Sequence, residues 1–158
     1  MLCRKSKNPE DIKYILDNLR FVDIEESKFV YGSNWKEKSF VNILNTKCDV
    51  IIGIDKNTNI PVCMGGVSDI SGYGNGVGIV WLLSTDEVKN HGYSLLKEIK
   101  IEFEEYEKKY KFLYNFIFHK NYLAKTWLKK LGFNFDCDNN LRLDIPSEFE
   151  FFYKILKH

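Results

Sequence analysis

Two titratable side chains stand at the ends of apolar runs, where a carboxylate or an imidazole can take a proton from a substrate. Asp69 lies at the end of the run 60–70 ("IPVCMGGVSDI"), and His119 directly follows the run 111–118 ("KFLYNFIF"). The run 76–84 ("GVGIVWLLS") carries no titratable group. A histidine at the end of a strand is more often packed or exposed than catalytic, and solvent can also accept a proton. The sequence therefore offers two candidates for a general base and assigns no catalytic residue.

The four cysteines do not form a metal-binding pattern. Cys3, Cys48, Cys63 and Cys137 include no C-x-x-C pair, and no histidine stands at ligand spacing from them. Their expected role is that of small buried hydrophobic side chains in a reducing compartment. We therefore expect no metal site.

Composition bounds the class of protein. The chain has 158 residues, of which 44% are hydrophobic and 28% charged, and its formal net charge is +1. These values fit one globular domain over residues 1–158. Because basic residues are scattered among acidic ones, nucleic acid and anionic membranes are not expected partners. Residues 1–11 lack the apolar stretch of a signal peptide, and the apolar run 77–83 is too short to cross a bilayer. We expect a soluble intracellular protein that is not secreted.

The first quarter of the sequence is predicted to be helical. In "NPEDIKYILDNL" (8–19), Asn8 can cap a helix that begins at Pro9, and apolar residues follow at helical spacing. Shorter helices are predicted in 23–32, ending at Gly32, and in 34–45.

The middle of the sequence is rich in strand-forming residues. Three runs, 48–55, 60–70 and 76–84, predict a meander of antiparallel strands with a hairpin at 56–59. The pattern 93–110 then predicts a long amphipathic helix with one solvated, charged face.

The last third predicts a buried strand at 111–118, a helix within 121–133 and a terminal strand at 149–156. Together with the long helix they make a βαβ crossover after the meander. The fold class is thus predicted to be α/β (α+β), with a mixed, mostly antiparallel central sheet flanked by helices.

The stretch "NYLAKTWLKKLGF" (121–133) is the most specific local pattern. Asn121 can cap its helix, Ala124 permits close approach to a neighbour, and Gly132 can take the left-handed conformation that ends a helix. Each of these features is also explained by packing alone.

The order of elements resembles the GNAT superfamily of acyl-CoA-dependent N-acetyltransferases over essentially the whole chain, and Asn121, Ala124 and 131–133 match its helix after the fifth strand. The resemblance implies acetyl-CoA or CoA as a possible ligand, although none is required for the fold. It places the side chain of Asn121 toward the pantetheine arm. It also implies that the backbone around Leu82 and Leu83 offers an N–H to the thioester carbonyl.

The turn before the long helix departs from the GNAT pattern. The family's Gln/Arg-x-x-Gly-x-Gly/Ala turn, which holds the pyrophosphate, corresponds to residues 87–92, where only Gly92 matches. Asn90 is expected to replace a glycine by taking a positive φ. Glu87 opposes a phosphate, whereas Lys89 and His91 favour it; an ordinary strand-to-helix turn remains an alternative. The cofactor-binding candidates here are Lys89, Asn90, His91, Gly92 and Tyr93.

The usual general acid of the family is also missing. Many members carry a tyrosine seven residues after the asparagine, which is the position of Leu128 here. Leu128 has no proton to give, and the indole of Trp127 does not titrate usefully.

A narrower resemblance concerns three spaced segments, "WLLSTDEV" (81–88), "KKYKFLYNFIFHKN" (108–121) and "WLKKLGF" (127–133). They are similar to small GNAT-like proteins of podovirus-type bacteriophages, which include an internal virion protein. This resemblance implies a role in virion assembly or as an internal virion component, with a degenerate acyl-CoA site, other phage proteins as partners, and the host cytoplasm or the virion as location.

The alternative is an active acetyl-CoA-dependent N-acetyltransferase that acts on a small amine or a protein amine. An enzyme should show a V-shaped gap between the fourth and fifth strands, with free N–H groups at residues 90–93. An assembly protein can have that gap filled, for example by Trp81 or Trp127, and should bury a large apolar surface against another chain.

Overall fold

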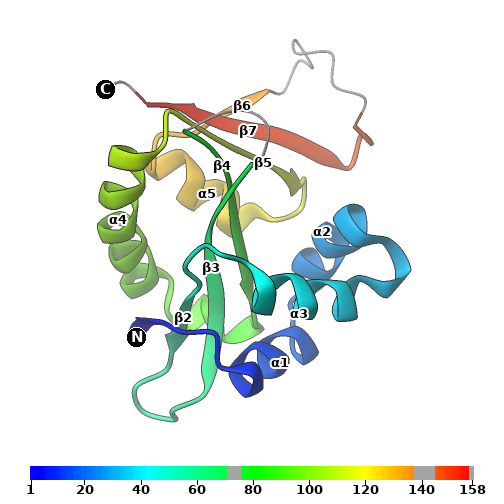
Figure 1. Cartoon of the computed structure of the whole chain (residues 1–158), viewed down its shortest axis with the longest axis vertical. Helices are drawn as coiled ribbons and strands as arrows, with labels where there is room; N and C mark the ends of the chain where they lie inside the picture. Colours follow the sequence, from blue (N-terminus) through cyan, green and yellow to red (C-terminus); the bar gives the residue numbers. More distant parts are fainter. Residues whose placement is uncertain (71–75, 137–144, 157–158) are drawn as a thin grey trace.

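A seven-stranded sheet runs through the molecule, and helices cover both of its faces (Figure 1). The computed structural model of the chain describes residues 1–70, 76–136 and 145–156. The strands are β1 (Leu2–Lys5), β2 (Ile51–Ile54), β3 (Pro61–Asp69), β4 (Val77–Ser84), β5 (Phe112–Phe118), β6 (Asn134–Asp136) and β7 (Phe149–Ile155). The helices are α1 (Pro9–Asp17), α2 (Phe21–Tyr31), α3 (Trp35–Asn45), α4 (Gly92–Lys109) and α5 (Tyr122–Lys130), with short 3₁₀ turns η1 (Gly32–Asn34) and η2 (Asp86–Asn90).

The strand order is β1-β2-β3-β4-β5-β7-β6. All neighbouring strands are antiparallel except β4 and β5, which are parallel and are joined by α4. The predicted fold class, the meander and the βαβ crossover are therefore confirmed.

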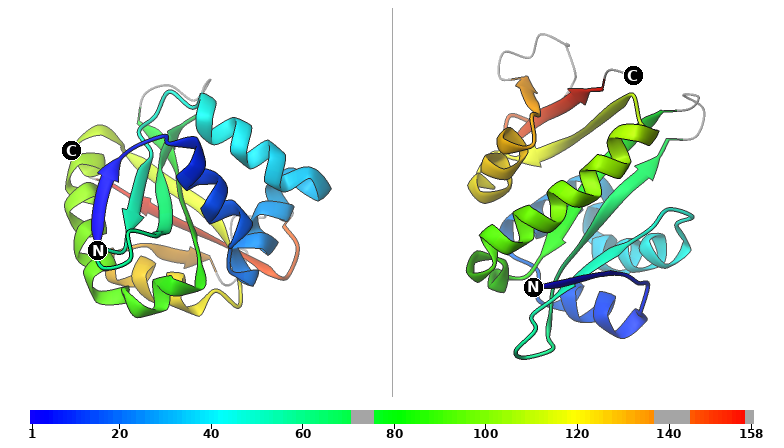
Figure 2. Two further views of the ribbon diagram at one scale, coloured as in Figure 1. Left: turned by 90° about the horizontal axis from the view of Figure 1, so that it is seen from below. Right: turned by 90° about the vertical axis from the view of Figure 1, so that its left-hand side faces the viewer.

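The two faces of the sheet carry different helices, as the end-on view of Figure 2 shows. On one face, α1 and α3 pack through Ile12, Ile15 and Ile43 against strand residues that include Met64. On the other face, α4 and α5 pack through residues such as Leu95 and Trp127. Because neighbouring strand residues point to opposite faces, one sheet supplies both cores.

Local signals set the helix ends as predicted. The side chain of Asn8 accepts hydrogen bonds from the N–H groups of the first turn of α1, and the side chain of Asn121 accepts one from Ala124 at 3.4 Å. Gly32 and Gly132 take positive φ values of 78° and 88° after α2 and α5. The observed α2 begins at Phe21, two residues before the predicted start.

Three of the cysteines lie in the described residues, and all three are free thiols. Cys63 is buried, Cys3 and Cys48 are half-buried, and Cys137 lies outside the described residues, as does most of the Gly-rich segment 71–76. Within the described ranges, no helix has both the length and the apolar character needed to cross a bilayer.

Candidate functional site

Strands β4 and β5 pair over only part of their length. Their register joins residues 77–79 to residues 112–114, yet β4 continues to Ser84 and β5 to Phe118. The carboxyl halves of the two strands therefore diverge, and the backbone groups on the facing edges need other partners. This is the V-shaped gap expected of an acyltransferase fold.

A single asparagine occupies the point where the strands separate. The side chain of Asn115 donates to the carbonyl of Val80 at 2.7 Å, and its Oδ1 accepts from the N–H of Phe116 at 2.7 Å. It thus provides a hydrogen-bond partner for one backbone group on the facing edge of each strand. In a continuous sheet, bonds between the two strands would fill this role. No sequence pattern singles out Asn115.

Helix α2 supplies the partners at the wide end of the gap. Asp23 accepts from the N–H of Ser84 at 3.3 Å and from its hydroxyl at 3.2 Å, while the N–H of Arg20 donates to the carbonyl of Ser84 at 3.0 Å. On the opposite strand, Glu26 Oε1 accepts from the N–H of Phe118 at 3.0 Å. Side chains from one helix therefore bridge both strand ends.

Leu82 is left between these contacts. Val80 and Ser84 direct their carbonyls toward the gap, whereas the N–H of Thr85 donates toward β3. Backbone groups alternate along a strand, so the N–H of Leu82 faces the gap and that of Leu83 faces β3. In the described part of the chain the N–H of Leu82 has no partner strand on that side.

Four polar side chains form a buried cluster at the wide end. Arg20 holds Asp23 with two contacts, Nε–Oδ2 at 2.8 Å and Nη2–Oδ1 at 3.3 Å, and both residues are almost fully buried. Asn121 accepts from Arg20 at 3.4 Å and donates to Glu26 Oε1 at 2.9 Å. One guanidinium therefore faces two carboxyl groups, of which Asp23 is the direct partner.

This arrangement favours a protonated Glu26. Burial raises the pKa of Glu26 to about 8, and the neighbouring Asp23 carboxyl adds to the effect. Burial also raises the pKa of Asp23, against the opposing pull of Arg20 and Ser84. A carboxyl group that titrates near pH 8 is suited to accept a proton from an amine. Glu26 is thus a candidate base that the sequence does not predict, because the pattern of α2 gives no sign that a polar side chain faces inward.

A cavity of about 350 Å³ joins these groups. It runs from the face that carries α2 and α3, through the gap, toward α4, and its lining includes Glu26, Leu82, Leu83, Asn121 and Trp127. Three residues predicted from the sequence, Leu82, Leu83 and Asn121, therefore meet the base candidate in one space. Trp127 forms part of the wall and leaves that space open, and Trp81 does the same.

The turn before α4 differs from the expected loop. Residues 86–90 form the 3₁₀ turn η2, and the prediction of a positive φ at Asn90 is wrong, because Asn59 is the one non-glycine residue with positive φ in the described ranges. Asn90 instead donates to Glu87 Oε2 at 3.1 Å. The N–H of His91 donates to the carbonyl of Val88, so this group is occupied, contrary to the expectation of free N–H groups at residues 90–93. The first helical bond of α4 comes from Leu95, and the N–H groups of residues 92–94 precede it, as at any helix start.

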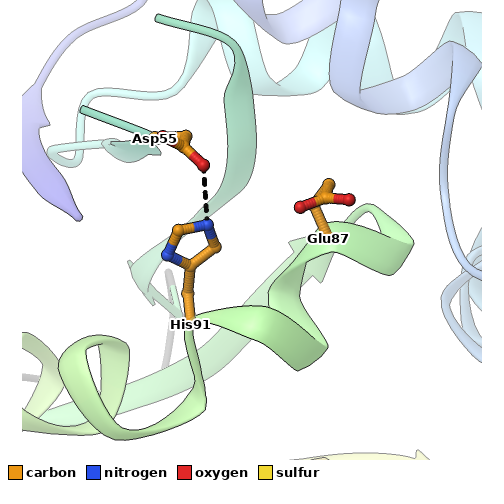
Figure 3. A group of neighbouring side chains, drawn as sticks. All are labelled: Asp55, Glu87 and His91. Atoms are coloured by element: carbon orange, nitrogen blue, oxygen red, sulfur yellow. Dashed lines mark hydrogen bonds and ion pairs between the residues drawn. The ribbon is translucent and has the colours of Figure 1, made fainter. Parts of the chain in front are cut away.

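A group of metal-ligand side chains also lies at this turn, although the sequence predicted no metal site. Asp55, Glu87 and His91 have ligand atoms within 4.8 Å of one another, and His91 Nε2 lies 3.0 Å from Asp55 Oδ2 (Figure 3). Backbone N–H groups of Asn57 and Thr58, together with His91, hold the pKa of Asp55 below its usual range. The visible role of the Asp55–His91 pair is to tie the β2–β3 hairpin to the start of α4.

The remaining predicted residues lie apart from the cavity. Asp69 is exposed at the end of β3, where it accepts a hydrogen bond from the hydroxyl of Tyr110. His119 lies 2.8 Å through Nδ1 from the carbonyl of Glu148. Neither residue lines the cavity. Lys89 pairs with exposed Asp86 at 3.4 Å.

Leu128 and Tyr93 lie in opposite surroundings, one buried and one exposed. Leu128 is buried in the core under α5, as an apolar side chain should be. Tyr93 is 88% exposed at the start of α4, beside Gly92.

The fold is shared with acetyltransferases of known structure. No protein-family model matches the sequence, and the curated proteins give no match either. Among solved structures, the chain is similar to a GNAT-family acetyltransferase from Streptococcus pneumoniae (17% identity, 99% of each chain, TM-score 0.63). It is also similar to aminoglycoside 6'-acetyltransferase type Ii (16% identity, 100% and 99% of the chains, TM-score 0.65) and to ribosomal-protein-alanine N-acetyltransferase from Brucella melitensis (14% identity, 99% and 100%, TM-score 0.63). The chain therefore has the GNAT fold.

Proposed function

We propose that the protein is an acyl-CoA-dependent N-acyltransferase, with acetyl as the simplest acyl group. The observation that carries the proposal is the meeting of the Leu82 N–H edge and the Glu26 carboxyl in one cavity. An acyl transfer to an amine needs a donor for the carbonyl oxygen and an acceptor for the amine proton. The fold supports the same reading, since its structural neighbours include acetyltransferases.

The residues present fit coenzyme A in two places. The divergent strands leave a backbone N–H at Leu82 for a thioester carbonyl, and the first-turn N–H groups of α4 suit a pyrophosphate. Exposed Asp86 and Glu87 oppose phosphate at this turn, and Lys89 is already paired with Asp86. We expect the helix start and the cavity, more than side-chain charge, to hold the ligand.

The chain's own groups would then act as follows. The bound cofactor supplies an acyl thioester. Leu82 would donate its N–H to the acyl oxygen, and Glu26, once ionised, would accept the proton of the attacking amine. The transfer would form the nitrogen–carbon bond of the amide and break the carbon–sulfur bond of the thioester. Because Leu128 carries no proton, solvent would supply the proton for the departing sulfur.

The bacteriophage reading of the sequence, a virion role with a degenerate site, stays a prediction. None of the structural neighbours described above carries a name that refers to a virion. The cavity leaves the gap between β4 and β5 open, whereas an assembly protein can have it filled.

Calorimetric titration of the protein with acetyl-CoA, followed by a thiol-release assay with a panel of primary amines, tests the proposed function. Binding in the micromolar range with amine-dependent release of free thiol would support an acyltransferase. Absence of heat at millimolar acetyl-CoA would contradict it and favour a repurposed scaffold.

A further inference from the structure

A row of apolar side chains lines the cavity on the face that carries α2 and α3. Phe29 of α2 stacks on Phe149 of β7 with ring centroids 4.2 Å apart, and it meets Phe116 of β5 at 5.9 Å with planes 66° apart. Ile79 and Trp81 of β4 also line this side. All five side chains are half-buried, so each leaves part of its surface to a ligand. We call these five residues the apolar wall.

The charge near this wall is low. Of the described residues that line the cavity on this face, Glu26 is the one carboxyl group, and the Arg20 guanidinium is engaged by Asp23. The other lining carboxylates, Glu98 and Glu102, belong to α4 on the opposite face of the sheet. A ligand with several ammonium groups would lose hydration here and find at most one partner.

The space also limits the size of the ligand. A cavity of about 350 Å³ stands near the lower end of the range for small-molecule sites. It must also admit the acyl group at the gap. The room on the α2–α3 side therefore suits one ring or a short branched chain.

Resting on the proposed function, we propose that the acceptor is a small primary amine carried on a single aromatic or branched alkyl body. The body lies against the apolar wall, and the amino group points to Glu26. Polyamines and other polycations are excluded by the same features. The transferred group goes to the amine nitrogen, and the amine proton goes to Glu26.

Equilibrium binding tests this assignment without relying on turnover. The probes are 2-phenylethylamine and spermidine, titrated into the full chain at pH 9, where Glu26 is ionised. We expect 2-phenylethylamine to bind at least about tenfold more tightly than spermidine. Equal affinity, tighter binding of spermidine, or no binding of 2-phenylethylamine would overturn the proposal.

Variants of the apolar wall test where the amine binds. Phe29→Leu and Phe149→Leu should each lower the affinity for 2-phenylethylamine by roughly fivefold or more, since each removes an aromatic ring from the wall. Phe21→Leu is the matched control, because Phe21 is 63% exposed on the same helix and does not line the cavity. It should change the affinity less than about twofold. Thermal melting checks that each variant is folded, and unchanged affinity in both wall variants would contradict the assignment.

The two proposals fail in different ways. Selective binding of 2-phenylethylamine without thiol release from acetyl-CoA would uphold the amine site and refute the transferase. Thiol release with spermidine, and not with 2-phenylethylamine, would uphold the transferase and refute the apolar acceptor.

Discussion

The side-chain amide of Asn115 donates a 2.7 Å hydrogen bond to the carbonyl of Val80, just where strand pairing between β4 and β5 ends. The same side chain accepts from the N–H of Phe116. The opening of the sheet is therefore built by a specific residue that occupies two edge groups at once.

Replacing Asn115 should cost stability. Asn115→Ala leaves the carbonyl of Val80 and the N–H of Phe116 without these partners in a half-buried setting, so the free energy of unfolding should fall by about 1–3 kcal/mol. Urea denaturation followed by circular dichroism measures the change. Asn42→Ala is the control, because Asn42 is exposed and its side chain donates to the hydroxyl of Tyr31 in an exposed hydrogen bond, so a loss under about 0.5 kcal/mol is expected. Equal losses in the two variants would contradict this role.

Glu26→Gln should remove the proposed base while keeping the shape of the side chain. We expect kcat/KM to fall by about 10²–10⁴-fold, and the rise of the wild-type rate through an apparent pKa of about 8 should disappear. Thiol release measured from pH 6 to 10 checks both. Glu25→Gln is the neighbouring control, since Glu25 does not line the cavity. A variant that keeps both the rate and the pH profile would show that another group takes the proton.

The same residue should make folding sensitive to alkali. Its pKa is raised from 4.5 to about 8 in the folded state, so the folded chain holds a proton that the unfolded chain has lost between these values. The folded state thus binds more protons, and this contribution to stability falls as the pH rises through that window. Glu26→Gln has no such proton. Its free energy of unfolding should therefore rise by about 2–4 kcal/mol relative to that of wild type between pH 5 and 9. Melting curves across this range give the answer, and a constant difference would refute the assigned pKa.

Arg20→Met tests the buried ion pair. It leaves Asp23 without its counter-charge in a position with no solvent access, and we expect a loss of about 3–5 kcal/mol at pH 7. The loss should shrink at pH 4, where Asp23 can take up a proton. Arg4→Met is the matched control, because its pair with Asp11 is partly exposed and should be worth about 0–1 kcal/mol. Equal losses in the free energy of unfolding would show that the buried pair contributes no more to stability than the exposed pair.

Asn90→Glu should weaken acetyl-CoA binding. A negative charge just before α4 opposes both the pyrophosphate and the helix dipole, and roughly three- to tenfold weaker binding is expected. Asn45→Glu introduces the same charge at the end of α3 and should leave the affinity unchanged. Calorimetry at low ionic strength compares them. No difference between the two variants would place the phosphates elsewhere.

Local sequence patterns predict the helices and strands. The cap at Asn8, the cap at Asn121 and the glycines after α2 and α5 depend on residues close in sequence, and the structure confirms them. The strand runs also pair as a meander, because each is apolar enough to be buried.

The polar contacts at the gap join residues that are far apart in the sequence, and local patterns do not predict such contacts. Glu26 contacts the N–H of Phe118, 92 residues away, and Asn115 contacts Val80, 35 residues away. Helix α2 has apolar residues around most of its circumference, so its pattern did not show that Asp23 faces the sheet. At the turn before α4, the expected loop conformation at Asn90 rested on family likeness, and the local chain preferred a 3₁₀ turn.

The bridge made by α2 has a consequence for the order in which the molecule assembles. Asp23 and Glu26 come early in the chain, whereas their partners Ser84 and Phe118 lie 61 and 92 residues later. Contacts between such distant segments close large loops and form late in folding. A chain still emerging from the ribosome thus has its N-terminal helices long before it has the strands they must bridge. We expect the cavity between β4 and β5 to be the last region to mature, so that ligand binding there would report completed folding of the domain.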